Sequence, residues 1–218
     1  MIEGKIRHIF TGYPDALYGF TNISYSPYAA EYKSALVFAV PYGEQLTIKY
    51  YTEESFDKGI QDAKRVLEGI LVKIEAALFE EKVSYYIPPV AQTSEEELAA
   101  PFSFKYAAAH AGLGWIGKND VVITEKYGPR VRLSAVLIDS TFTYGPAITE
   151  SHCPDLCEKC VKICPHHALH NVKWDINKLR SDIIDYKLCN QKRSLYIEKH
   201  GRKNACGLCM AVCPFGIE

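Results

Sequence analysis

Residues 153–165 read CPDLCEKCVKICP and residues 206–214 read CGLCMAVCP, and these two stretches decide how the rest of the chain is interpreted. Both contain the same spacing, Cys-x2-Cys-x3-Cys-Pro. One further cysteine, Cys189, stands alone between them, so all eight cysteines of the 218-residue chain lie in its C-terminal third. Cysteines gathered in this way indicate bound metal, an iron–sulfur cluster or a set of disulfides.

The repeated spacing is the one that bacterial ferredoxins use to hold [4Fe–4S] clusters. Each cubane takes four thiolates, and in two-cluster proteins the cysteine that precedes proline ligates the other cluster. This rule predicts two ligand sets with no cysteine left over. They are Cys153, Cys157, Cys160 and Cys213 for the first cluster, and Cys164, Cys189, Cys206 and Cys209 for the second. The loop between Cys153 and Cys157 is expected to bulge, because three residues separate these cysteines where two are usual.

Disulfides and structural zinc are the alternatives. Disulfides need an oxidising compartment, and no signal peptide opens this chain. Zinc accepts Cys-x2-Cys pairs, but it does not account for two Cys-x3-Cys-Pro endings. The absence of a targeting segment and of an apolar run of about 20 residues predicts a cytoplasmic protein with no membrane span.

The length of the chain allows one medium domain and one small module. We expect an α+β cofactor or substrate domain at residues 1–149 and a two-cluster ferredoxin-like module at residues 150–218. The first carries 14 Lys and Arg against 18 Asp and Glu, and the second 11 against 8. The basic excess is interpreted as a solvated face that offsets the negative charge of the clusters. The alternative is a docking patch for an acidic electron donor or for nucleic acid. It gathers at Lys192, Arg193, Lys199, Arg202 and Lys203.

The predicted domain mixes strands and helices. The apolar run Ala35–Val40 predicts a central strand that is covered on both faces. A long amphipathic helix is expected from Ser55 or Asp57 to about Glu81, followed by a strand at Val83–Ile87. The many Tyr and Phe residues of the first thirty positions, interpreted as short helical and strand pieces, either form core or line a flat cofactor.

Further elements precede the cysteines. Residues 94–97 resemble a capping box, and a helix is expected at about residues 102–111 with Gly112 as its C-terminal cap. Strands at residues 120–124 and 130–139 are predicted to pair as a hairpin around Tyr127-Gly128-Pro129.

The segment 112–119 reads GLGWIGKN and matches the dinucleotide-binding spacing G-x-G-x-x-G. That fingerprint must follow a strand and open a helix, whereas these glycines follow a helix and precede a strand, so the context disfavours a dinucleotide site. Glycine also lets another group approach the backbone closely, which suits a loop against a large cofactor. The alternative is a tight corner with Trp115 in the core. The candidate cofactor-binding residues are Gly112, Gly114, Trp115, Gly117, Lys118 and Asn119.

Three features resemble the epoxyqueuosine reductase family, which is related to the reductive dehalogenases. They are the stretch KYAAAHAGLGWIGKN at residues 105–119, the strand ending at residues 137–139 before the two cysteine runs, and the segment CNQKRSLYIE from Cys189. The resemblance implies a nitroreductase-like, cobalamin-binding α+β domain that receives electrons from a two-cluster ferredoxin-like module. It implies a reductase, and the best-known reaction of the family removes an epoxide oxygen in tRNA queuosine synthesis.

The chain departs from the family at two places. An Asp-Thr-Ala-Pro-like segment precedes the glycines in the family and its aspartate resembles a proton donor, whereas Leu98 stands at that position here. The adjacent Glu97 is the remaining candidate catalytic residue. The sequence also stops at Glu218, where members active on tRNA continue into helical repeats, so it resembles a short member.

The sequence therefore predicts an iron–sulfur oxidoreductase that passes electrons through two clusters to a cobalamin-type cofactor or a bound small-molecule substrate. A non-catalytic electron carrier is the first alternative, and an epoxyqueuosine reductase that modifies tRNA is the second. The expected electron donor is a flavodoxin or a ferredoxin.

Overall fold

The computed structural model of the chain describes residues 1–43, 46–89, 98, 100–194 and 206–217. The chain divides into two compact units whose sequences are interleaved. The sheet unit comprises residues 1–41, 63–113 and 132–148, and the cluster unit comprises residues 42–62, 114–131 and 149–218. A domain boundary at residue 149 stays a prediction, but the unit that contains the cysteines also takes in two earlier segments.

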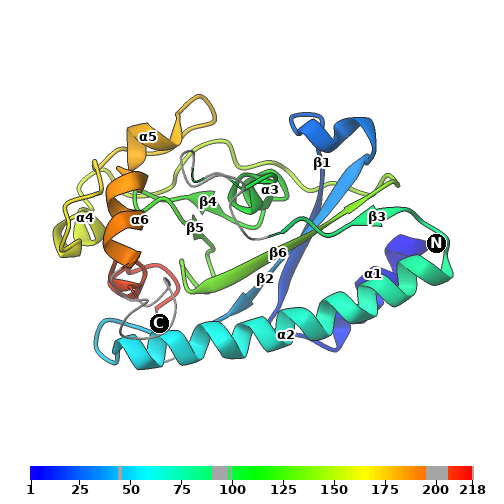
Figure 1. Ribbon diagram of the computed structural model, residues 1–218, viewed down its shortest axis with the longest axis horizontal. Coiled ribbons are helices and arrows are strands. Elements are labelled where there is room, and N and C mark those ends of the chain that lie inside the picture. Colours follow the sequence, from blue (N-terminus) through cyan, green and yellow to red (C-terminus); the bar gives the residue numbers. More distant parts are fainter. Residues whose placement is uncertain (44–45, 90–97, 99, 195–205, 218) are drawn as a thin grey trace. The chain divides into compact units, whose positions relative to one another are not determined.

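Four strands in the order β1-β2-β6-β3 form the sheet of the sheet unit (Figure 1). Leu17 of β1 lies opposite Ala39 of β2, and Tyr85 of β3 lies opposite Ile138 of β6, both in antiparallel pairs. Every residue from Ser34 to Val40 is buried, which confirms the predicted central strand. The strands are β1 (Leu17–Asn22), β2 (Ser34–Pro41), β3 (Tyr85–Tyr86) and β6 (Val131–Ile138).

Two of the six aromatic residues in the first thirty positions, Phe10 and Phe20, are buried in the core. Helix α1 (Ile2–Thr11) buries one face, and its last core residue, Phe10, stacks on Tyr18 with ring centroids 4.0 Å apart. Phe20 stacks on Phe142 at 4.3 Å. A 3-10 helix, η1 (Pro27–Ala30), follows β1. Phe10 and Phe20 are therefore core residues, as one of the two interpretations of this stretch expected, and the half-buried Tyr18 packs against Phe10.

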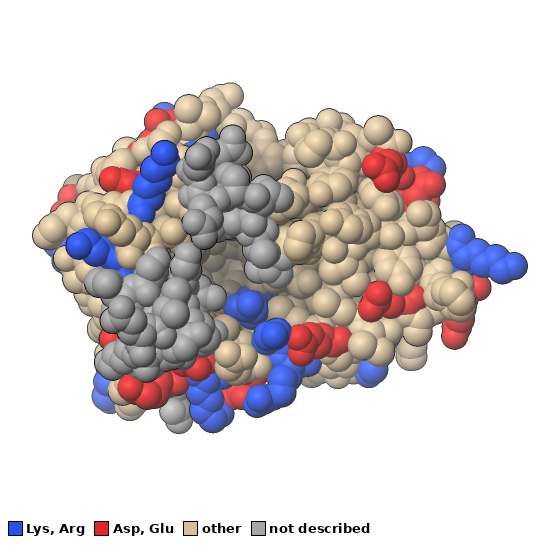
Figure 2. Space-filling model, viewed as in Figure 1, with Lys and Arg blue, Asp and Glu red and all other residues tan. Residues whose placement is uncertain are grey.

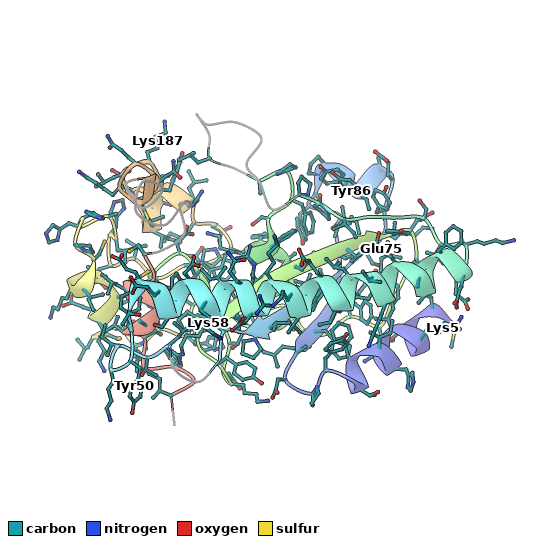
Figure 3. The ribbon with its side chains drawn as sticks, turned by 60° about the horizontal axis from the view of Figure 1, so that its bottom comes forward. Lys5, Tyr50, Lys58, Glu75, Tyr86 and Lys187 are labelled. Carbon is teal, nitrogen blue, oxygen red and sulfur yellow. The ribbon has the colours of Figure 1, made fainter. Side chains whose placement is uncertain are left out.

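The long helix α2 (Glu53–Glu80) begins in the cluster unit and continues into the sheet unit, where it runs along one side of the sheet (Figures 1 and 3). Most of its predicted apolar stripe is buried, although Val66 is exposed. Tyr85 donates a hydrogen bond to Glu75, labelled in Figure 3, at 3.1 Å. Lys5 of α1 pairs with Glu80 and Glu81 at 3.2 and 2.9 Å.

Helix α3 (Phe104–His110) packs against β1 and β2 and ends at the predicted cap. Gly112 adopts a positive φ of 74°, which glycine tolerates without a steric penalty. The N–H of Gly112 donates to the carbonyl of Ala109 at 3.1 Å, and the N–H of Leu113 donates to that of Ala108 at 2.9 Å. These two bonds form a Schellman motif, so the C-terminal cap is confirmed.

The predicted hairpin between residues 120–124 and 130–139 is wrong. Strand β5 (Val122–Ile123) pairs instead with β4 (Trp115–Ile116) inside the glycine segment, and β6 joins the four-stranded sheet. A tight turn inside the glycine segment makes this pairing. Asp120 donates its N–H to the carbonyl of Gly117 at 2.9 Å and adopts a φ of 58°, which reverses the chain between β4 and β5. The turn at Tyr127-Gly128-Pro129 forms an isolated bridge between Thr124 and Gly128, while β6 buries Ser134–Ile138 in the larger sheet, which is more stable than a two-stranded hairpin.

The cluster unit consists of short helices around the cysteines. Helices α4 and α8 pack against each other. Two small apolar clusters support them, one of Leu46, Phe56 and Ile60, and one of Ala168, Leu169 and Ile184. The helices are α4 (Lys159–Ile163), α5 (Arg180–Ile183), α6 (Tyr186–Ser194) and α8 (Leu208–Ala211). Among the described helices, none combines the length and the apolar character needed to cross a bilayer.

Candidate metal centre

The first predicted ligand set surrounds one cavity in the cluster unit. Cys153, Cys157 and Cys160 line it from the first cysteine run, and Cys213 lines it from the second. The packing of α4 against α8 places the end of the second run beside the first. Cys153 and Cys213 are buried, and the other two are half-buried. Cysteines that are up to 60 residues apart in sequence therefore meet at one site, in the crossed arrangement that the proline rule predicts.

The second predicted set is also brought together. Burial raises the pKa of the Cys209 thiol well above its usual value, and the charges of Cys206, Cys160, Cys189 and Cys164 raise it further, so Cys160 of the first set is also close. Three of the four pack against the apolar cluster of Ala168, Leu169 and Ile184. Helix α6 carries Cys189, the isolated cysteine of the sequence. The backbone N–H of Cys189 donates to the carbonyl of Asp185 at 3.0 Å.

Burial opposes ionisation of the thiols while no metal is bound. It raises the pKa of Cys160 to about 12 and that of Cys213 to about 11, although the charge of Arg130 works against the second shift. Iron ligation requires thiolates, so loading of these sites must release protons.

All eight cysteines are described, and none of them forms a disulfide. Within the described residues, no three His, Cys, Asp or Glu side chains are grouped closely enough to hold a single metal ion. A cubane places each thiolate on a separate iron, so its ligands surround a larger space than the ligands of one ion.

The second half of the glycine segment lies against the cysteine loops. Lys118 is 3% exposed, and its ammonium donates to the carbonyls of Asp155 and Cys157 at 2.9 and 3.1 Å. Asn119 donates through Nδ2 to the carbonyl of Cys209 at 3.1 Å. Both side chains line the cavity of the first cysteine set. These two residues therefore join the loops that carry both predicted clusters.

Trp115 is packed inside the cluster unit. Its side chain is 2% exposed, and its ring lies 4.6 Å from that of His152 and 5.0 Å from that of Phe215. The atoms that approach the neighbouring glycines also belong to the protein. A Cβ on Gly114 would overlap the carbonyl oxygen of Ile123, and one on Gly117 would overlap Cδ1 of the same residue. The role of this segment in binding a large cofactor stays a prediction.

Gly114→Ala is expected to destabilise the protein by about 1–3 kcal/mol, because the added methyl group overlaps the backbone of β5. Gly145→Ala is the matched control, since its Cβ would meet only the carbonyl oxygen of Ala111 at an ordinary 3.5 Å. Thermal unfolding of the iron-loaded protein measures both changes. Equal melting temperatures for the two variants would contradict the predicted overlap.

Sequence reasoning missed two features of the structure. Arg130 is 5% exposed, and its guanidinium donates to the carbonyls of Cys213 and Met210 at 3.1 and 3.4 Å and to that of Phe215. The sequence contains no local signal for this, because the arginine lies about 80 residues from the loop that it binds.

The second feature is a group of three titratable rings in the sheet unit. The ring of His110 lies 4.8 Å from that of Tyr25 and 4.4 Å from that of Tyr106, and the two tyrosine rings are 4.9 Å apart. The Nε2 atom of His110 is buried and has no hydrogen-bond partner among the described residues. Burial lowers the pKa of His110 and raises the pKa values of both tyrosines, so all three are neutral at pH 7.

The predicted catalytic candidate Glu97 lies outside the described residues, as do residues 94–96 of the predicted capping box. Leu98 is described and is buried at 6% exposure, with a positive φ of 50°. A leucine in this place supplies no proton.

Comparison with known proteins supports an iron–sulfur module in the part of the chain that contains the cysteines. Residues 152–216 match the family described as "4Fe-4S double cluster binding domain". The chain is 28% identical over 178 residues to an epoxyqueuosine reductase of Cellulophaga algicola, in a match that covers 78% of this chain and 56% of that protein. The predicted resemblance to the epoxyqueuosine reductase family is confirmed. The chain thus carries two [4Fe–4S] clusters, and it spans about half the length of the curated relative that it matches.

Two solved structures share the fold. One is described as a reductive dehalogenase whose structure suggests a mechanism for B12-dependent dehalogenation, with a TM-score of 0.66, 18% identity, and coverage of 96% of this chain and 31% of that one. The other is an epoxyqueuosine reductase with an epoxyqueuosine-modified tRNA-Tyr stem loop, with a TM-score of 0.59, 17% identity, and coverage of 99% and 66%. The expected α+β fold with a double-cluster module is therefore confirmed.

Proposed function

We propose that this protein is a reductase in which the two clusters pass electrons to a cobalamin-type cofactor or to a substrate bound by the sheet unit. The cysteine sets, each of them gathered in one place, carry the proposal, because the clusters that they hold transfer one electron at a time. A flavodoxin or a ferredoxin is the expected electron donor. Relatives named as reductases favour this function over a non-catalytic electron carrier.

The group of Tyr25, Tyr106 and His110 is the part of the sheet unit that best fits a ligand. A buried ring nitrogen without a partner is unfavourable, so a bound molecule that supplies a hydrogen bond to His110 Nε2 would be stabilised there. Tyr25 retains 38% exposure, so the group is accessible from solvent. When bound, a corrinoid would supply a cobalt ion that accepts electrons and transfers them to a substrate.

The same three residues can donate and accept protons. Removal of oxygen or halogen from an organic substrate consumes protons as well as electrons. Both tyrosines keep their hydroxyl protons at neutral pH because burial raises their pKa values, so each can donate a proton to a bound substrate, and the neutral imidazole of His110 can accept one. We assign this role to the group because Leu98 occupies the position of the family's aspartate.

His110→Phe is expected to weaken the binding of a corrinoid about tenfold or more, since it keeps the ring volume but removes the nitrogen that has no partner among the described residues. Anaerobic titration of the iron-loaded protein with cob(II)alamin, followed by absorbance, measures the affinity. His8→Phe is the control, because His8 is an exposed histidine on α1 of the same unit. The iron content of both variants should equal that of the wild type.

A wild-type protein that binds no corrinoid in either the cob(I) or the cob(II) state would contradict the cobalamin proposal. Equal affinity in the wild type and in both variants would show that the ligand binds away from His110. Cluster reduction without any ligand binding would instead favour the electron-carrier alternative.

Reduction of epoxyqueuosine in tRNA is the second candidate function. It is favoured by the curated relatives named epoxyqueuosine reductase and by the shared fold with a structure that contains a modified tRNA stem loop. Among the described residues on the face shown in Figure 2, acidic and basic side chains are interspersed. Most of the predicted basic patch, from Lys199 to Lys203, lies outside the described residues. Conversion of epoxyqueuosine to queuosine in a stem-loop RNA, supplied with reduced donor, tests this function directly.

A further inference from the structure

Two buried cations of the cluster unit come from the segment 114–131, outside both cysteine runs. Lys118 is 3% exposed and Arg130 is 5% exposed. Lysine and arginine are almost never buried to this extent unless they are paired, because the loss of hydration is costly. Their surroundings must therefore supply compensating negative charge.

The hydrogen bonds of these two side chains go to main-chain carbonyls. Lys118 binds the carbonyls of Asp155 and Cys157 in the first cysteine run. Arg130 binds the carbonyls of Met210, Cys213 and Phe215 at the end of the second. Each cation thus holds one of the two loops that line the cavity of the first cysteine set.

Carbonyl groups solvate a cation but do not neutralise it. Among the described residues, neither Lys118 nor Arg130 lies within ion-pair distance of a carboxylate. The carboxylate of Glu158 forms an ion pair with Lys162 at 2.9 Å, which lowers its pKa, and the charge of Lys118 has a smaller effect in the same direction. The cavity is also lined by Lys159, an exposed cation. Within the described residues, the thiolates that line the cavity and the occupant that they hold are the remaining source of negative charge, and Lys118 lines this cavity.

A ligated cubane supplies this charge. Four thiolates outweigh the positive charge of the iron–sulfur core in both of its redox states, and the complex gains one negative charge on reduction. Two of the three N–H groups of Lys118 donate to carbonyls, which leaves the third for a cluster sulfur. A fixed cation beside the cluster stabilises the reduced form more than the oxidised form, because the reduced form carries more negative charge.

We propose that Lys118 and Arg130 are charge partners of the cluster held by Cys153, Cys157, Cys160 and Cys213, and that they raise its reduction potential. They act as positioning residues and touch the loops rather than the substrate. In the step that they assist, the oxidised cluster accepts one electron from the reduced donor protein, and no bond is formed or broken. The proposal depends on the cluster and not on which substrate the protein reduces.

Lys118→Met is the variant that tests the proposal, because it keeps the aliphatic chain and removes the charge. Lys126→Met is the matched control, since Lys126 is an exposed lysine in the same segment. Redox titration of the iron-loaded protein, monitored by electron paramagnetic resonance, measures both midpoint potentials. At a fixed ambient potential, the ratio of reduced to oxidised cluster should fall about tenfold for one cluster of the Lys118 variant, a shift of about 59 mV for a one-electron couple.

The other cluster, and both clusters of the Lys126 variant, should keep their wild-type potentials. Two unchanged potentials in an iron-loaded Lys118→Met protein would overturn the proposal. If this variant loses iron, Lys118→Gln, which is neutral but retains a donor, is titrated in its place and must show the same fall. If that variant also loses iron, Lys118→Arg must restore a full complement, and failure to restore it would overturn the proposal.

Discussion

Cys213→Ala is expected to remove one whole cluster and to lower the iron content from about eight atoms per chain to about four. The reason is the crossed ligation. Cys213 ends the second cysteine run, yet it lines the cavity of Cys153, Cys157 and Cys160 in the first. A cubane that loses one of its four thiolates exposes an iron to solvent and is lost readily.

Iron and acid-labile sulfide are measured after anaerobic reconstitution. Cys164→Ala is the matched control, because Cys164 occupies the equivalent place in the first run and its thiol is grouped with Cys189, Cys206 and Cys209. The two variants should each retain one cluster, and the two remaining paramagnetic signals should differ. A Cys213→Ala protein with the same iron content as the wild type would contradict the crossed assignment. One or two zinc ions per chain, with no iron, would contradict both clusters.

Removal of the clusters is expected to open the cluster unit while the sheet unit keeps its fold. Two apolar groups described in the cluster unit are small, with three buried residues in each. Without the anionic cluster, Lys118 and Arg130 become buried charges with no compensation, and the cysteine loops lose the centre that joins them. The sheet unit contains the four-stranded sheet and the buried part of α2, so it retains a core of its own.

Limited proteolysis with mass spectrometry tests this expectation. The cluster-free protein should be cleaved roughly tenfold faster than the loaded protein, because the open form becomes a large fraction of the population. The early cuts should fall in residues 149–218 and also in residues 42–62 and 114–131, which belong to the same unit. Equal cleavage rates with and without iron would contradict the prediction. Cuts confined to residues 150–218 would instead favour the two continuous domains that the sequence predicts.

The sequence by itself determined the cluster chemistry. Ligation of a cubane depends on the number of residues between neighbouring thiolates, which is a local property, so the spacing rule alone places Cys213 with Cys153, Cys157 and Cys160. Apolar periodicity likewise located β2 and α2, and glycine after a helix predicted the cap at Gly112. Except for the crossing of Cys213 to the first cysteine run, each of these features is specified by residues that lie close together in the chain.

Only the tertiary structure decided which distant segments meet. Residues 122–123 could pair with a strand on either side of them in the sequence. They pair with β4 across a turn at Gly117–Asp120, while β6 is buried in the four-stranded sheet, which is more stable than a two-stranded hairpin. The burial of Lys118 and Arg130, and the grouping of Tyr25 with Tyr106 and His110, join residues about 40 to 85 positions apart. No local pattern encodes such contacts, because a charged or aromatic side chain has the same sequence neighbours whether packing leaves it in water or removes it from water.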